Sequence, residues 1–303
     1  MLVRKMEESG PQEITPISVK EACDLFIGEQ RGRNLRAPSL QKYELLTGEL
    51  VREFRGELRA VDRSGLGRYQ KTWELRLCPG SRLHKLSRLR KFFRFCMENG
   101  WIRDNPAKNL TEPIFERKQV IPFSEEELEK IFWATEVYQD IPKGRRKQVR
   151  AFVLVLRYTG LRIGDVVALR KDLIQDGKLC LRTAKTRTQV WIPLKDEVKE
   201  ILNDLPTSGG YFFWSGMGTL KSAISSWHRS MTTLFRLAGV KGHPHQFRHY
   251  FSVDLLSKGV SIEDVAALLG HQSSLITARY YNAFVPARQA RLEQAIERAW
   301  KLA

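Results

Sequence analysis

The stretch HPHQFRHYFS, residues 243–252, places three histidines and an arginine within seven positions, just before an apolar helical pattern. A helix that begins near Pro244 or His245 puts His245 and Arg248 three positions apart on one face. Both side chains can then donate hydrogen bonds to one anion near the positive end of the helix. The pattern indicates a phosphate site, although many surface helices carry His and Arg at this spacing.

The same stretch can be interpreted as a metal site, because His243, His245 and His249 could converge on zinc. However, no carboxylate lies at the helical spacing of a hydrolytic zinc site. The fixed positive charge of Arg248 would also repel a metal ion. The sequence therefore disfavours zinc, and we predict no metal ligands.

The charge of the chain points to a polyanionic partner. Its 303 residues include 51 Lys and Arg against 34 Asp and Glu, a net charge of +17. Up to residue 120 there are 24 basic and 16 acidic residues, and after it 27 and 18. Because both halves are basic, DNA or RNA is favoured over an anionic membrane surface.

The cellular setting follows from what the sequence lacks. The longest purely apolar run, AFVLVL at residues 151–156, is far too short to span a bilayer. The first ten residues have no apolar core of a signal peptide. The four cysteines are scattered without CxxC spacing, which disfavours disulfides and cysteine-based zinc sites. We expect a cytoplasmic protein without membrane contact.

Two domains are predicted. Residues 14–110 repeat apolar positions every three or four residues, as a small helical domain does. Residues 111–123 contain prolines and mixed charge with little periodicity, which is typical of a linker. A second domain, residues 124–303, begins at Ser124, with Glu127 three positions later in the capping-box pattern.

One helix of the first domain combines an apolar stripe with a basic face. The expected stripe consists of Leu86, Leu89, Phe93 and Cys96. The cations that lie mostly away from it are Arg82, Lys85, Arg88 and Lys91. Such a helix can pack inward and contact DNA phosphates outward, or simply keep a solvated charged face. We predict DNA contacts for these four cations.

The second domain has a helical pattern with one break. The segments KLCLR, residues 178–182, and QVWIPL, residues 189–194, read as two short strands around a polar turn that contains Lys185. From the turn alone, Lys185 would be an ordinary solvated lysine.

Two further stretches contain polar residues in apolar surroundings. In YTGLRIGDVVALR, residues 158–170, Arg162 needs a partner, which could be Asp165 or a ligand in a cleft. In LLGHQSSLITARYYNAF, residues 268–284, a glycine ends one helix and a serine caps the next. That short helix carries Tyr280 and Tyr281, and core packing is the common role of an isolated tyrosine pair.

Together these stretches resemble the tyrosine recombinase (phage integrase) family, including its Xer-like members. The matching motifs, in the family's order, are TGLRIGD, TAKTRTQVWIPL, HQFRH and LLGHQSSLITARYY. The likeness spans roughly residues 14–290, because LRKFFRFCMENGWIRDNPAKNL resembles the end of the family's core-binding domain. Phe247 stands where leucine is more usual, which we interpret as a packing change. The resemblance implies a mainly α fold with a small antiparallel sheet, a helical core-binding domain and a mixed α/β catalytic domain.

The resemblance also implies an active site, composed of Arg162, Lys185, His245, Arg248, His271 and Tyr280. Tyr280 follows His271 by nine positions, the family spacing, whereas Tyr281 follows it by ten. In this scheme Lys185 is a general acid, and Asp165 orients an active-site arginine or histidine. His243 and His249 receive no catalytic role.

The implied function is site-specific DNA recombination through a covalent 3′-phosphotyrosyl intermediate, without a cofactor. The implied partners are double-stranded DNA with short inverted-repeat sites and a homotetramer on synapsed DNA. A type IB topoisomerase and a catalytically silent DNA-binding protein remain as alternatives. Residues 287–303 form an amphipathic terminal helix, which can pack on its own domain or, as the resemblance favours, on a neighbouring subunit.

Overall fold

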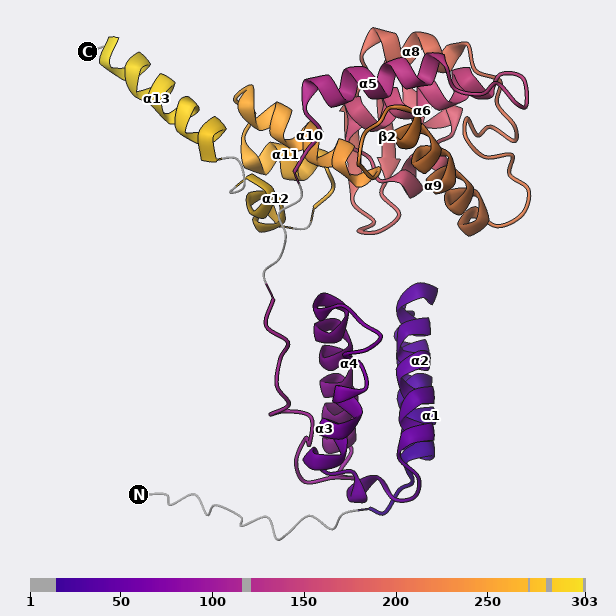
Figure 1. The fold of residues 1–303 in the computed structure, drawn as a ribbon, viewed down its shortest axis with the longest axis vertical. Coiled ribbons are helices and arrows are strands. Elements are labelled where there is room, and N and C mark those ends of the chain that lie inside the picture. The colour runs from indigo at the N-terminus through magenta and orange to yellow at the C-terminus, as the bar shows by residue number, and fades with distance from the viewer. Residues whose placement is uncertain (1–14, 116–120, 272, 282–284, 302–303) are drawn as a thin grey trace, which may run out of the picture. The chain divides into compact units, whose positions relative to one another are not determined.

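The computed structural model describes residues 15–115, 121–271, 273–281 and 285–301 (Figure 1). The chain divides into two compact units between residues 117 and 118. Helices dominate both units, and the second unit contains one small antiparallel sheet. The predicted fold class is therefore confirmed. In the described ranges, no helix has both the length and the apolar character needed to cross a membrane.

The first unit packs its helices around an aromatic core. Its elements are α1 (Val19–Gly32), α2 (Ala37–Glu53), the 3₁₀ turn η1 (Leu58–Ala60), α3 (Arg63–Lys71) and α4 (Pro79–Glu98). Ser18 and Asp62 cap α1 and α3 by accepting hydrogen bonds from backbone N–H groups of the first turn. At the centre, the fully buried rings of Phe26 and Phe92 meet edge to face at 5.4 Å.

Helix α4 confirms the predicted apolar stripe. Its four members are at most 1% exposed: Leu86, Leu89, Phe93 and Cys96. Burial of such side chains is the main source of stability for a helix in a small domain, contributing about 1.5–3 kcal/mol each.

The second unit combines one small sheet with a larger set of helices. Its elements are α5 (Glu125–Glu136), α6 (Arg145–Thr159), α7 (Ile163–Val167), η2 (Lys171–Leu173), β1 (Ile174–Gln175), β2 (Lys178–Arg182), β3 (Gln189–Pro193), α8 (Asp196–Asn203), α9 (Leu220–Leu237), α10 (His245–Ser257), α11 (Ile262–Leu268), α12 (Ser274–Tyr281) and α13 (Val285–Lys301). The capping box of Ser124 and Glu127 at α5 is present as predicted. The apolar run at residues 151–156 is entirely buried within α6.

The sheet has the order β1-β2-β3 and is antiparallel throughout. Both predicted strands are confirmed, and Arg182 pairs with Gln189 where the hairpin turn begins. In β3, buried Val190 and Ile192 alternate with the exposed Trp191, the pattern of a strand with one face on the core. The hairpin therefore projects its turn, residues 183–188, beyond the paired strands.

A close approach brings α10 to the end of α6. Gly160 ends α6 in the left-handed conformation, with φ of +59°. A Cβ at this position would lie 2.6 Å from Cδ1 of Phe251 on α10. Only glycine allows both the backbone conformation and this contact. In Figure 1, α10, α11 and α12 lie together in the second unit.

Candidate active site

Arg248 lies in the first turns of α10 and is only 3% exposed. Its Nη1 donates to the carbonyl of Gly160 at 2.9 Å, and its Nη2 donates to the carbonyl of Leu269 at 2.6 Å. Gly160 ends α6 and Leu269 ends α11, where helix carbonyls need partners outside the helix. The guanidinium is thus fixed in orientation by two other segments of the unit.

Arg162 stands at the N-cap of α7 in extended conformation, two residues after Gly160. Its Nη1 is buried and has no hydrogen-bond partner among the described residues. No carboxylate in the described ranges forms an ion pair with it, so the alternative pairing with Asp165 is not found. A buried donor without a partner destabilises a fold by about 1–3 kcal/mol. Such a group is expected where an anionic ligand will bind.

Asp165 has a different partner from the one we predicted. It is 7% exposed, and its Oδ1 accepts a hydrogen bond at 2.8 Å from the backbone N–H of Ala184. The prediction that Asp165 orients an active-site arginine or histidine is wrong. The carboxylate instead holds the hairpin turn that carries Lys185.

The hairpin turn is also held on its other side. The hydroxyl of Thr186 donates to the carbonyl of Gly270 at 2.8 Å. Within the turn, the backbone N–H of Thr183 donates to the carbonyl of Thr188 at 3.0 Å. The side chain of Lys185 is exposed at the tip. The residues before and after Lys185 are therefore each bonded to another segment of the unit.

His271 follows Gly270 and lies between α10 and α12. Its Nε2 is 2.8 Å from Nη2 of Arg248, and its Nδ1 is 2.9 Å from the hydroxyl of Thr277 on α12. Because a guanidinium can only donate, Nε2 accepts, and the single proton of the neutral ring resides on Nδ1. The pKa of His271 is lowered to about 4, first by burial and then by the charges of Arg248, Arg162 and Lys185. These three cations therefore lie close to the ring.

His245 is the first residue of α10, as predicted. The pKa of His245 is lowered to about 3, first by burial and then by the charges of His249, Arg248 and Arg162. The rings of His245 and His249 meet edge to face at 4.8 Å. Within the described ranges no cluster of His, Cys, Asp or Glu could hold a metal ion. Near pH 7 His245 and His271 are neutral hydrogen-bonding groups beside two permanent cations.

Tyr280 and Tyr281 both lie in α12, near its C-terminal end. Tyr280 is three positions beyond Thr277, whose side chain is fully buried against His271. The side chains of both tyrosines lie outside what the structure describes. Of the six predicted site residues, Arg162, Arg248, His245 and His271 converge, and Lys185 lies on the turn beside them.

The four cations predicted to contact DNA lie on α4, and three of them have partners inside the first unit. Lys85 pairs with Glu49 and lies 4.6 Å from the ring of Trp73. Lys91 donates to the side chain of Gln30 at 3.0 Å. Arg88 is partly exposed on the same helix.

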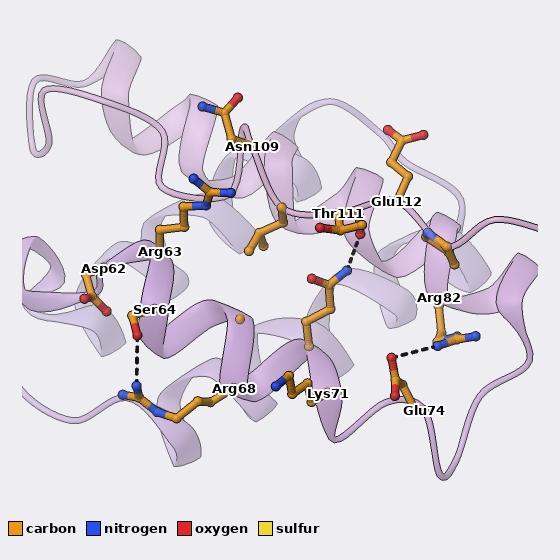
Figure 2. A pocket seen from close by; sticks show the side chains of 14 residues that line it. Asp62, Arg63, Ser64, Arg68, Lys71, Glu74, Arg82, Asn109, Thr111 and Glu112 are labelled. Carbon is orange, nitrogen blue, oxygen red and sulfur yellow. Dashed lines mark hydrogen bonds and ion pairs between the residues drawn. The ribbon is translucent and has the colours of Figure 1, made fainter.

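The fourth cation, Arg82, pairs with Glu74 at 3.2 Å at the edge of a hollow of about 840 Å³ (Figure 2). The charged residues that line this hollow are Asp62, Arg63, Arg68, Lys71, Glu74, Arg82 and Glu112. Because acidic and basic side chains both line it, the hollow has no uniformly positive wall for a phosphate backbone.

Known proteins with similar sequences are DNA recombinases. Residues 122–285 match the model of the phage integrase family. Tyrosine recombinase XerA of Pyrococcus furiosus is 31% identical over 202 residues, which are 64% of this chain and 66% of that protein. Tyrosine recombinase XerD of Pseudomonas aeruginosa is 30% identical over 217 residues, which are 67% of this chain and 70% of that protein.

Solved structures of lambda integrase share the fold. A lambda integrase dimer bound to a COC′ core site matches with a TM-score of 0.71 at 18% identity, covering 88% of this chain and 77% of that chain. A lambda integrase tetramer bound to a Holliday junction matches with a TM-score of 0.72 at 17% identity, covering 91% and 82%. At these identities the likeness concerns the fold alone.

Proposed function

Because this chain belongs to the phage integrase family of tyrosine recombinases, we propose that it recombines specific DNA sites by cutting and rejoining strands through Tyr280. The phenolic oxygen of Tyr280 gives up its proton to solvent and attacks the scissile phosphorus. The bond from phosphorus to the 5′ oxygen breaks, and the leaving oxygen takes up a proton. The resulting 3′-phosphotyrosyl ester conserves the energy of the phosphodiester. The 5′ hydroxyl of another strand then attacks this ester, releases the tyrosine and completes the exchange without a cofactor.

The observation that carries this proposal is the buried Nη1 of Arg162, which has no partner among the described residues and belongs to a cluster with Arg248, His245 and His271. Two guanidinium groups can bind the nonbridging phosphate oxygens, where negative charge gathers in the transition state. The two neutral histidines add hydrogen bonds without adding charge. The cluster is thus suited to a phosphoryl group in the act of transfer.

Lys185 is proposed as the general acid. The 5′ oxygen is a poor leaving group unless it receives a proton as the bond to phosphorus breaks, and general acids of this kind contribute about 10²–10⁴-fold in rate. Lys185 lies on a turn held against both α7 and the Gly270 turn. Its ammonium group gives the proton and regains it from solvent or in the reverse step.

We propose that a core-binding domain, residues 14–110, and a catalytic domain, residues 124–303, hold duplex DNA, with residues 111–123 as the linker. The net charge of +17, shared by both halves of the sequence, supports this arrangement. On α4, Arg88 is the simplest phosphate ligand. Arg82, Lys85 and Lys91 would exchange their present partners for phosphates.

The active assembly is proposed to be a homotetramer that joins two DNA sites, each with short inverted repeats. An apolar stripe on α13 supports this, because Leu292, Ile296 and Trp300 are 46%, 46% and 75% exposed and a neighbouring subunit could cover them. A lambda integrase of the same fold forms a tetramer on a Holliday junction. With DNA as the substrate, we expect the protein to work in the cytoplasm.

The decisive experiment traps the covalent intermediate. Duplexes that the protein binds are first selected from a random pool, and the preferred sequence is rebuilt with a nick near the cleavage point. The short fragment released on cleavage diffuses away, so the covalent adduct accumulates. Tyr280→Phe should abolish the adduct while DNA binding remains within about twofold, because only the hydroxyl is lost.

Tyr281→Phe is the matched control and should still form the adduct. Peptide mapping that found DNA on Tyr281 would move the nucleophile by one residue and keep the reaction class. Tight binding with no adduct on any tyrosine would leave a DNA-binding protein, and relaxation of supercoiled DNA without a preferred site would point to a topoisomerase.

A further inference from the structure

We propose that Thr186 is a positioning residue for the general acid, and that its hydroxyl keeps Lys185 in reach of the 5′ oxygen by tying the hairpin turn to Gly270. This inference rests on the proposed function, because it concerns the protonation of the leaving group. It assigns a role to a side chain that lies next to Lys185 and takes no part in binding the phosphate.

The turn that carries Lys185 needs such an anchor. Beyond the last paired residues of the sheet, Arg182 and Gln189, the chain forms a loop whose residues 184, 185 and 187 are exposed. A lysine side chain has four rotatable bonds and about 2 kcal/mol of rotamer entropy. A mobile turn would add further freedom, and proton transfer requires the donor within hydrogen-bond reach of its acceptor.

Two hydrogen bonds bracket the lysine in sequence. The residue before it, Ala184, donates its backbone N–H to the buried carboxylate of Asp165 at 2.8 Å. The residue after it, Thr186, donates its hydroxyl to the carbonyl of Gly270 at 2.8 Å. Asp165 lies on the helix that begins after Arg162, and Gly270 directly precedes His271. Lys185 is therefore tied to both segments that present phosphate ligands.

The contact with Gly270 is also a close one. Gly270 is buried, has φ of +63°, and a Cβ there would lie 3.1 Å from Cγ2 of Thr183 and 3.2 Å from Cγ1 of Val190. The base of the hairpin thus packs directly on the turn before His271. The hydrogen bond from the Thr186 hydroxyl to Gly270 therefore fixes the distance between the hairpin turn that carries Lys185 and the turn before His271.

The test separates positioning of the acid from general damage to the fold. In a substrate whose 5′ bridging oxygen is replaced by sulfur, the leaving group departs as a thiolate and needs no proton. On the oxygen substrate, Thr186→Val should form the covalent adduct about tenfold more slowly, which is less than the 10²–10⁴-fold contribution of an intact general acid because Lys185 is displaced and not removed. On the sulfur substrate it should match the wild type, as Lys185→Ala should. Thr186→Ser keeps the hydroxyl and should restore cleavage of the oxygen substrate.

Two controls complete the design. Thr188→Val changes a neighbouring threonine of the same turn and should leave both rates unchanged. The double variant Thr186→Val/Lys185→Ala should cleave no more slowly than Lys185→Ala alone. Without the lysine there is no general acid left for Thr186 to position. Equal slowing of Thr186→Val on both substrates, or no slowing on either, would overturn the role of Thr186. If the wild type formed no adduct on either substrate, the proposed function itself would fall.

Discussion

Replacing Gly160 by alanine should destabilise the second unit by an amount that the geometry allows us to work out. The left-handed backbone, with φ of +59°, costs a non-glycine residue about 1–2 kcal/mol. The new Cβ would lie 2.6 Å from Cδ1 of Phe251 and 3.0 Å from Cδ2 of Leu269, both in the core. Overpacking of this kind costs about 1–3 kcal/mol. The expected total is about 2–5 kcal/mol.

Gly239→Ala supplies the matched control. Gly239 has φ of +64° in the same unit, but a Cβ there would meet nothing within 4 Å. Gly239→Ala should therefore show only the destabilisation that comes from the left-handed backbone. The difference in stability between the two variants then measures the cost of overpacking against Phe251 and Leu269. In a domain of this size, 1 kcal/mol corresponds to about 2–4 °C in melting temperature.

Scanning calorimetry of the full chain measures this difference, with the transition of the first unit as an internal reference. Gly160→Ala should melt about 2–12 °C below Gly239→Ala, following the overpacking estimate. Phe251→Leu should recover part of the loss in a double-mutant cycle, because it removes the ring atoms that the new methyl meets. Melting temperatures within 1 °C of each other would refute the reasoning.

The remaining predictions concern charge and solution conditions. DNA affinity should fall steeply between low and moderate salt, because lysines and arginines of both units displace counterions, and a flat titration would contradict a DNA-binding surface. Strand cleavage should survive EDTA, whereas loss on chelation and recovery with zinc or magnesium would favour a metal-dependent reaction. The pKa values of His245 and His271, lowered to about 3 and about 4, predict that the second unit loses stability as pH falls from about 6.5 towards 4. The sign follows because the unfolded histidines take up protons in this window while the folded ones do not. His271→Asn should flatten the dependence in pH-resolved melting curves, and an unchanged slope would count against it.

Local signals in the sequence predicted the local structure well. The spacing of Ser124 and Glu127 marks the start of α5, and the apolar pattern after Pro244 marks the start of α10. The strands β2 and β3 follow from their composition and the polar turn between them. The strand β1 was missed because two residues, Ile174 and Gln175, are too few to show any period.

The contacts that assemble the site could not be predicted in this way. Arg248 reaches Gly160 across 88 positions, and Thr186 reaches Gly270 across 84. Such pairs leave no periodic trace in one sequence, because the partner is a backbone carbonyl that every residue possesses. Asp165 illustrates the limit: the sequence suggested an arginine or a histidine as its partner, but its Oδ1 accepts a hydrogen bond from the backbone N–H of Ala184.

The same difficulty applies to the cations of α4. Their spacing predicted an outward basic face, but Lys85 pairs with Glu49, which lies 36 positions earlier in the chain. A helical pattern shows which way a side chain faces and not which element lies there. The arrangement of α2 beside α4 supplies the missing carboxylate.

The position of Arg248 bears on how an inactive form of this protein should be made for use as a reagent. Its guanidinium closes the ends of α6 and α11 through the carbonyls of Gly160 and Leu269. An alanine there would remove these hydrogen bonds, which join three helices, together with a proposed phosphate ligand. A failed reaction could then reflect a loosened domain. Lysine would not repair this, because an ammonium group cannot reproduce a planar fork. A variant meant to capture recombination sites without cutting them is better made by changing Tyr280, which leaves the hydrogen bonds of Arg248 in place.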